Sequence, residues 1–216
     1  DMPRIDTGIE TPAESAIMVI AVIYVIAAIF NLFIPDTGAR YTRQQTNPLL
    51  LVRDFYGCFI TLWKDKLGQI SLAVTTLFWG AGATLQFIVL KWAESHLGLP
   101  LDKGAILQGI TALGIAIGAI MAARLIPLKR SLDTLPAGIA MGGVVVIMIF
   151  VTNLPLIYAL LILMGALAGF FVVPMNALLQ HRGYVLLSAG HSSAVQNFNE
   201  NVSILVMLAI YAAMIK

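Results

Sequence analysis

Six long apolar stretches, separated by short polar segments, dominate this chain. A helix needs about 20 mostly apolar residues to cross a bilayer, and each stretch has that length. Helices of a soluble domain would instead carry polar side chains along one face. Because 59% of the residues are hydrophobic and only 11% are charged, we predict an all-α fold, a polytopic membrane helix bundle with six transmembrane helices. The predicted spans cover residues 13–34, 68–92, 104–127, 134–153, 155–178 and 190–215.

The basic residues predict how the chain is oriented, because cytoplasmic loops carry an excess of Lys and Arg. If the first span runs from outside to inside, nine of the 13 basic residues fall inside and four fall outside. The inside residues are Arg40, Arg43, Arg53, Lys64, Lys66, Arg124, Lys129, Arg130 and Arg182, and the outside residues are Arg4, Lys91, Lys103 and Lys216. We therefore expect both chain ends outside. We expect no cleavable signal, since the first apolar run lacks a basic leader.

Three regions are expected along the chain. Residues 1–34 form an external loop and the first span, residues 35–67 form a cytoplasmic linker, and residues 68–216 form a five-helix bundle. Within the linker, residues 49–64 have their large apolar side chains near helical spacing, which predicts a helix lying on the inner membrane interface. A simple connector without a role of its own is the alternative that we favour for this helix. The single Cys58 excludes an internal disulfide framework.

Three successive spans contain glycines four residues apart. Such glycines lie on one face of a helix and let another backbone approach closely. We expect these glycines to pack the bundle rather than to touch a substrate. The pairs are Gly114 with Gly118, Gly138 with Gly142, and Gly165 with Gly169.

Polar residues inside a span are informative because the bilayer core offers them no water. In the last span, Gln196, Glu200 and Ser203 are spaced four and three residues apart and share a face, which Ser193 and Asn197 flank. Glu200 is the only acid well inside a predicted span. A charge at mid-helix costs about 2.5–3.5 kcal/mol on insertion scales, so Glu200 should face a wet cavity, face a partner or be protonated. A buried cluster that only holds helices together is the alternative, as is a span that begins later.

Other polar positions complete a candidate substrate-binding set. Trp79 precedes Gly80 in a run of small residues where a helix can bend, Gln86 lies further along the same span, and Asn176 follows Pro174 near the inner end of the fifth span. The candidate set is Glu200, Gln196, Asn197, Asn176, Gln86 and Trp79. No HExxH, CxxC, GxSxG or Walker pattern occurs, and no basic, aromatic surface for nucleic acid occurs. We therefore expect no enzyme activity, no cofactor, no metal and no nucleic-acid partner.

Three segments together resemble the bacterial lysophospholipid transporter family, a branch of the major facilitator superfamily. They are LFWGAGATL at 77–85, GFFVVPMNALLQ at 169–180 and AVQNFNEN at 194–201. The resemblance implies twelve spans in two six-helix halves, of which this chain would be the carboxy-terminal half without its last span. It therefore implies that the missing amino-terminal half is a partner. Many family members have a basic residue where this chain has Gln86, which weakens an assignment of phosphate binding to that residue.

The resemblance also implies the function. The protein would be part of a secondary transporter or flippase that moves lysophospholipids across the bacterial inner membrane to the cytoplasmic face, with the two halves rocking around a midplane site. Gln196, Asn197 and Glu200 would meet the head group, and Phe170 and Phe171 would meet the acyl tail. Two alternatives stay open: a major-facilitator exporter of another small amphiphilic solute, and a non-transporting membrane scaffold attached to an acyltransferase.

Overall fold

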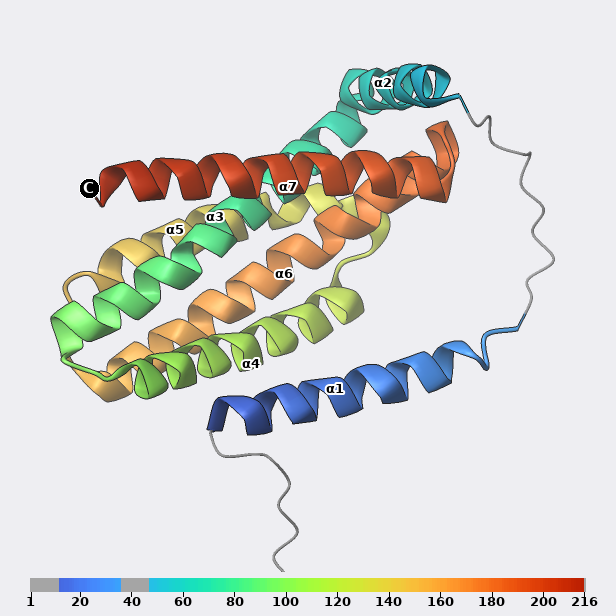
Figure 1. The fold of residues 1–216 in the computed structure, drawn as a ribbon. Coiled ribbons are helices and arrows are strands. Elements are labelled where there is room, and N and C mark those ends of the chain that lie inside the picture. The colour runs from blue at the N-terminus through green and yellow to red at the C-terminus, as the bar shows by residue number, and fades with distance from the viewer. Residues whose placement is uncertain (1–11, 36–46, 216) are drawn as a thin grey trace, which may run out of the picture. The chain divides into compact units, whose positions relative to one another are not determined.

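The computed structural model describes residues 12–35 and 47–215, and these residues form helices without any strand. The helices are α1 (Pro12–Asn31), α2 (Pro48–Lys64), α3 (Lys66–Leu97), α4 (Leu101–Leu125), the 3₁₀ helix η1 (Leu128–Thr134), α5 (Leu135–Met148), α6 (Leu154–Leu186) and α7 (Ala189–Met214). The prediction of an all-α membrane bundle is confirmed. Figure 1 draws these helices as a ribbon.

Five segments of the described residues are long and apolar enough to cross a membrane. They belong to α1, α3, α4, η1 with α5, and α6. Helix α7 forms over 26 residues, close to the predicted sixth span. It is not among the five because its first half carries the polar residues that the sequence analysis singled out.

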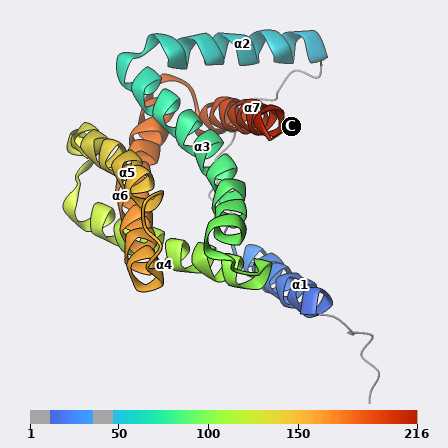
Figure 2. The same cartoon turned by 90° about the vertical axis from the view of Figure 1, so that its left-hand side faces the viewer.

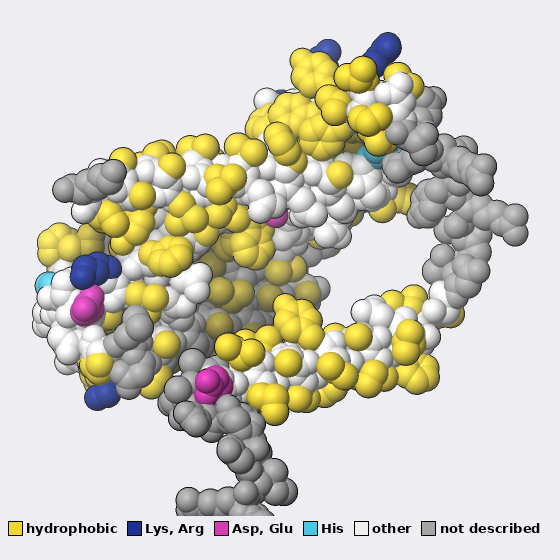
Figure 3. All heavy atoms as spheres, viewed as in Figure 1, with side chains coloured by type: hydrophobic (Ala, Val, Ile, Leu, Met, Phe, Trp, Pro, Cys, Tyr) yellow, Lys and Arg dark blue, Asp and Glu magenta, His cyan; other side chains and the backbone are white. Residues whose placement is uncertain are grey.

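The chain divides into two compact units, residues 1–45 and residues 46–216. In the first unit, α1 is an apolar helix whose described side chains are exposed along its whole length. In the second unit, hydrophobic side chains dominate the visible face of the bundle, whereas Lys and Arg side chains lie at its edges (Figure 3). A helix that is apolar on its outer face is suited to a lipid environment rather than to water.

Helix α2 is the predicted interfacial helix, and it packs onto one end of the bundle. It begins with Asn47, whose side chain accepts a hydrogen bond from the backbone N–H of Leu49 at 3.1 Å, followed by Pro48 in the first turn. Leu62 is fully buried, and the Phe55 ring meets the Phe198 ring of α7 edge-on at 5.3 Å between centroids. Figure 1 and Figure 2 show α2 lying crosswise to α7. This is the orientation expected of a helix that lies along the membrane surface.

Helices α4 and α6 lie side by side, and glycines bring their backbones together (Figure 1). A Cβ atom on Gly118 would collide with the backbone carbonyl of Ala166, and a Cβ atom on Gly169 would collide with that of Ile115. The same holds for the pair formed by Gly114 and Gly165. The predicted packing role is therefore confirmed for these four glycines. The third pair differs, because Gly138 faces the Phe171 ring whereas Gly142 has nothing near it.

Two segments differ from the expected spans. The fifth span was predicted to end at residue 178, but α6 continues through Pro174 to Leu186, so Arg182, which was expected beyond the span, is helical. The fourth span was predicted over residues 134–153, but α5 ends at Met148, and the 3₁₀ helix η1 leads into it from Leu128. A span predicted from hydropathy ends where polar residues begin, whereas backbone hydrogen bonds let the helix itself continue into a polar region.

The glycine contacts predict a position-specific effect on stability. Replacing Gly118 with Ala should lower the melting temperature of the detergent-solubilised chain by about 5 °C, because overpacking of about 2 kcal/mol would push α4 away from α6. Gly142→Ala is the matched control, since its Cβ would enter open space. Thermal unfolding followed by size-exclusion chromatography measures both variants. Equal melting temperatures for Gly118→Ala and the unmodified chain would contradict the packing role.

Cys58 provides a test of the predicted orientation. It is the only cysteine, it is partly buried on α2, and burial followed by the nearby Asp54 carboxylate raises the pKa of its thiol. A membrane-impermeant maleimide should therefore label inverted vesicles slowly at pH 7 and faster at pH 9, because the thiolate reacts. Sealed, intact cells should stay unlabelled until a detergent opens them. Labelling of the sealed cells would show that the chain has the opposite orientation.

Candidate functional site

Three of the predicted site residues meet in one hydrogen-bonded group, which we call the polar cluster: Asn176, Gln196 and Glu200. The side-chain amide nitrogen of Gln196 donates to Asn176 Oδ1 at 3.0 Å and to Glu200 Oε1 at 2.8 Å. Asn176 comes from α6, and the other two residues lie one turn apart on α7. All three side chains are half-buried. The cluster thus links two helices, and each of its side chains keeps some exposed surface.

The polar cluster has hydrogen-bonding capacity left over. Among the described residues, no partner is recorded for the amide nitrogen of Asn176, for Glu200 Oε2 or for the side-chain oxygen of Gln196. The first of these is a donor and the other two are acceptors. A polar group that is taken out of water without a partner costs free energy. The cluster is therefore suited to bind a ligand that has both an acceptor group and a cationic donor.

The buried face of α7 positions the polar cluster. Ser188 caps the helix by accepting from the backbone N–H of His191 at 3.4 Å. Ser192, Val195 and Asn199 point into the bundle, and the amide of Asn199 is satisfied by its own helix, through the Val195 carbonyl at 2.8 Å. With this face fixed by packing, helical geometry places the next positions around the helix at the edge of the interface. Gln196 and Glu200 occupy those positions.

Helix α3 approaches the same stretch of α7 through a glycine. A Cβ atom on Gly80 would collide with the Ser203 hydroxyl, so the glycine allows the close contact between these helices. Thr76 lies one turn before Gly80 on the same face, and its hydroxyl is buried without a hydrogen-bond partner among the described residues. Most Thr hydroxyls in the described helices bond their own backbone, as Thr75 does with the Leu72 carbonyl at 3.2 Å. An unused buried hydroxyl beside α7 adds to the polar character of this region.

The other predicted site residues lie apart from the polar cluster. Gln86 Nε2 donates to Gln108 Oε1 of α4 at 2.8 Å, and Gln108 Nε2 donates to the backbone carbonyl of Gln86 at 3.1 Å. The side chain of Trp79 is 44% exposed and contacts Phe78 edge-on. Asn197 is exposed on α7, around the helix from the cluster. The structure therefore joins three of the six candidates and leaves the other three separate.

The aromatic residues expected at an acyl tail differ in their surroundings. Phe171 is 9% exposed, and its ring packs against Gly138 of α5 and against the Phe78 ring at 6.3 Å. It is thus engaged in holding α6 against its neighbours. Phe170 is only half-buried. Of the two, Phe170 is the one with surface left to meet a tail.

An ion pair between Asp65 and Arg182 is the main polar contact that the sequence analysis missed. Arg182 Nε donates to Asp65 Oδ2 at 2.8 Å, and the second guanidinium nitrogen donates to Oδ1. Asp65 also caps α3, because its Oδ2 accepts from the backbone N–H of Gly68 at 2.8 Å. The hydrogen bonds from Arg182 hold the pKa of Asp65 below its ordinary value, although burial opposes them, and the Gly68 bond lowers it further. The pair joins the start of α3 to the end of α6.

This ion pair predicts a stability effect with a defined pH dependence. Asp65→Asn should lower the melting temperature by about 5 °C, since a charge-assisted bond of about 2 kcal/mol is lost while Asn still caps the helix. Because the pKa of Asp65 is lowered in the folded state, the stabilisation is complete above the ordinary value of 3.8 and is lost as the pH falls through the lowered pKa.

The control for this prediction is Asp133→Asn. It breaks the exposed pair that Arg130 Nε forms with Asp133 Oδ2 at 2.7 Å, and such exposed pairs contribute little. The double variant with Asp65→Asn and Arg182→Gln should lower the melting temperature by less than the sum of the two single decreases. Fully additive melting-temperature changes would show that the two residues do not interact.

Comparisons with known proteins connect this helix bundle to a family. Over 202 residues, the chain is 41% identical to the lysophospholipid transporter LplT of Yersinia enterocolitica, a match that covers 93% of this chain and 50% of the relative. The protein of the same name in Yersinia pestis strain Pestoides F is 42% identical over 203 residues, which cover 94% of this chain and 50% of the relative. No family model and no solved structure matches. The chain spans about half the length of the curated relatives that it matches. With the five apolar segments, these similarities identify a multi-pass protein of the bacterial inner membrane that is similar to lysophospholipid transporters over nearly its whole length.

Proposed function

We propose that this chain forms one wall of a path along which a lysophospholipid crosses the inner membrane, and that the polar cluster contacts the lipid head group. The observation that carries the proposal is the unused hydrogen-bonding capacity of Asn176, on the apolar helix α6, and of Gln196 and Glu200, on the polar first half of α7. The names of the relatives support the choice of lipid.

The chemistry of the head group matches the groups that the polar cluster leaves free. A lysophosphatidylethanolamine head carries an anionic phosphate and a cationic ammonium. The Asn176 amide would donate to a phosphate oxygen, while Glu200 would accept from the ammonium, and such charge-assisted bonds are stronger than neutral ones. Trp79 and Phe170, both with exposed surface, are suited to contact the single acyl chain. The Gln86 side-chain nitrogen is engaged with Gln108, which leaves the side-chain oxygen of this exposed residue to accept from a lipid.

The rest of the transporter completes this proposal. Residues 1–34 would be an external loop and a sixth span, residues 35–67 would link two halves on the cytoplasmic side, and residues 68–216 would contribute five helices to the carboxy-terminal half. An amino-terminal half would supply the opposite wall, because midplane sites of such transporters lie between two repeats. The lipid would move toward the cytoplasmic face.

Glu200→Gln tests the role of the polar cluster in the full-length transporter. The new amide can still accept the hydrogen bond from Gln196, so the protein should fold, whereas the negative charge that attracts an ammonium is lost. We expect transport of lysophosphatidylethanolamine per folded molecule to fall by about tenfold, which corresponds to about 1.4 kcal/mol. Glu200→Ala should be no milder, because Gln196 then loses an acceptor. Flipping of labelled lipid in proteoliposomes, normalised to folded protein, measures the effect.

Glu94→Gln is the matched control, since it makes the same chemical change at an exposed residue paired with Lys91. Lysophosphatidylglycerol, which has no ammonium, should be less affected by Glu200→Gln than the ethanolamine lipid. Unchanged transport of both lipids would leave the polar cluster with a packing role alone. Transport of a soluble amphiphile in preference to both lipids would favour the exporter alternative.

A further inference from the structure

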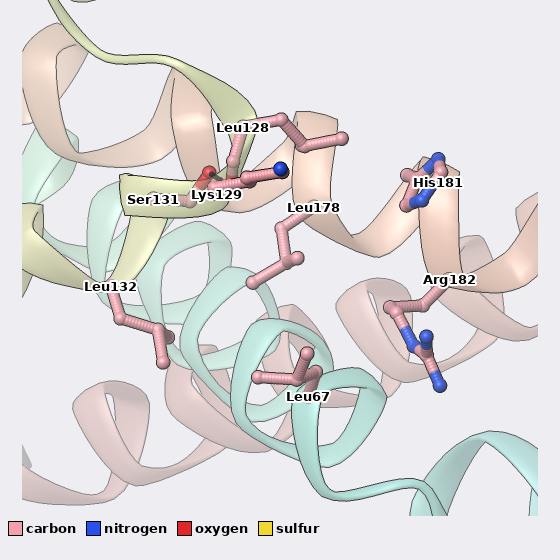
Figure 4. A pocket seen from close by; sticks show the side chains of 8 residues that line it. All are labelled: Leu67, Leu128, Lys129, Ser131, Leu132, Leu178, His181 and Arg182. Carbon is pink, nitrogen blue, oxygen red and sulfur yellow. Dashed lines mark hydrogen bonds between the residues drawn. The ribbon is translucent and has the colours of Figure 1, made fainter.

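A second polar feature lies away from the polar cluster, in a cleft between the start of α3, η1 and the last turns of α6. Its volume is about 200 Å³. Four leucines supply its apolar lining: Leu67, Leu128, Leu132 and Leu178. Ser131 and three basic side chains complete it, the basic ones being Lys129, His181 and Arg182 (Figure 4). No residue of the polar cluster lines the cleft.

The charges around the cleft are unbalanced. Arg182 is compensated by Asp65, but no acidic partner is recorded for Lys129 among the described residues, and no acid lines the cleft. The neighbouring Arg130 differs, since it pairs with Asp133. Figure 4 shows the Lys129 side chain extending from η1 toward the side on which His181 and Arg182 lie. The cleft therefore favours an anion, and Lys129 is the cation left free to bind it.

The position and the lining of the cleft narrow the identity of that anion. The cleft lies at the end of the bundle where α2 packs, because α3 begins there and α6 ends there. This is the end that the distribution of Lys and Arg assigns to the cytoplasm, where anionic head groups attract basic pockets between membrane helices. An inorganic anion would bury no apolar surface against the four leucines, whereas the glycerol backbone and first acyl carbons of a lipid would.

We propose that this cleft binds the phosphate of an anionic phospholipid resident in the inner leaflet, such as phosphatidylglycerol, with Lys129 as the main contact. The resident lipid occupies the cleft from the bilayer side and holds η1 against α6. It is not the transported molecule, so this site does not depend on the function of the polar cluster.

Lipid titration of the full chain in detergent, followed by native mass spectrometry, tests this site. Phosphatidylglycerol should bind more tightly than phosphatidylcholine. Lys129→Gln should weaken phosphatidylglycerol binding about fivefold, the contribution of one basic residue near an anionic membrane surface. Arg130→Gln is the matched control, because it removes the adjacent charge outside the cleft and should leave binding unchanged. Lys129 is exposed and forms no recorded bond, so its replacement should leave the melting temperature unchanged.

Other results would overturn the proposal. Equal binding of phosphatidylglycerol by the unmodified chain and by Lys129→Gln would contradict the proposed site. Equal weakening by Lys129→Gln and Arg130→Gln would indicate attraction by overall charge. Displacement of phosphatidylglycerol by millimolar inorganic phosphate would indicate a free-anion site. Preference for lysophosphatidylglycerol over phosphatidylglycerol would assign the cleft to the transported substrate. Because binding is measured without transport, none of these outcomes depends on Glu200.

Discussion

The close approach of α4 and α6 is the interaction on which the bundle depends. Between membrane helices there is no hydrophobic driving force, so van der Waals contact and interhelical hydrogen bonds must hold them together. Gly114 and Gly118 of α4 face Gly165 and Gly169 of α6 so tightly that any Cβ would meet a carbonyl. Such close contact is possible only where both helix faces are lined by glycines, which have no Cβ atom. The rest of the fold is arranged around the face of α6 that this stripe leaves free.

Helix α6 carries a different interaction on each of its sides. Its glycine stripe packs on α4, Asn176 reaches toward α7, Phe171 fills the space beside Gly138 of α5, and Arg182 ties its end to Asp65. A movement of α6 would therefore change the polar cluster, the ion pair and the basic cleft together. For α6 to move in this way, its contact with one neighbouring helix must stay rigid while its contact with another is weak enough to change. The polar cluster, with three half-buried side chains, provides the weaker contact.

Much of this architecture could be predicted from the sequence, and the reasons differ from element to element. The helices follow from hydropathy and length, and the packing role of four glycines follows from their spacing, although that spacing did not identify α4 and α6 as the partners. Grouping Gln196 with Glu200 needed only helical periodicity. Asn176 joining them, Gln86 pairing with Gln108, and Asp65 meeting Arg182 across 117 positions could not be predicted, because one sequence does not specify which helix faces are neighbours. The continuation of α6 to Leu186 was missed because hydropathy falls before the helix ends.

Asp65 and Glu200 show why one acid is structural and the other is a candidate for function. Asp65 is saturated, since both of its oxygens accept from Arg182 and one also caps α3. Glu200 accepts from a neutral amide only, and no cation is recorded beside it among the described residues. A carboxylate kept for stability would be expected to have a cationic partner, since an uncompensated charge in a membrane is costly. Under the proposed function, the ammonium of a lipid head group would be the cationic partner that Glu200 lacks within this part of the chain.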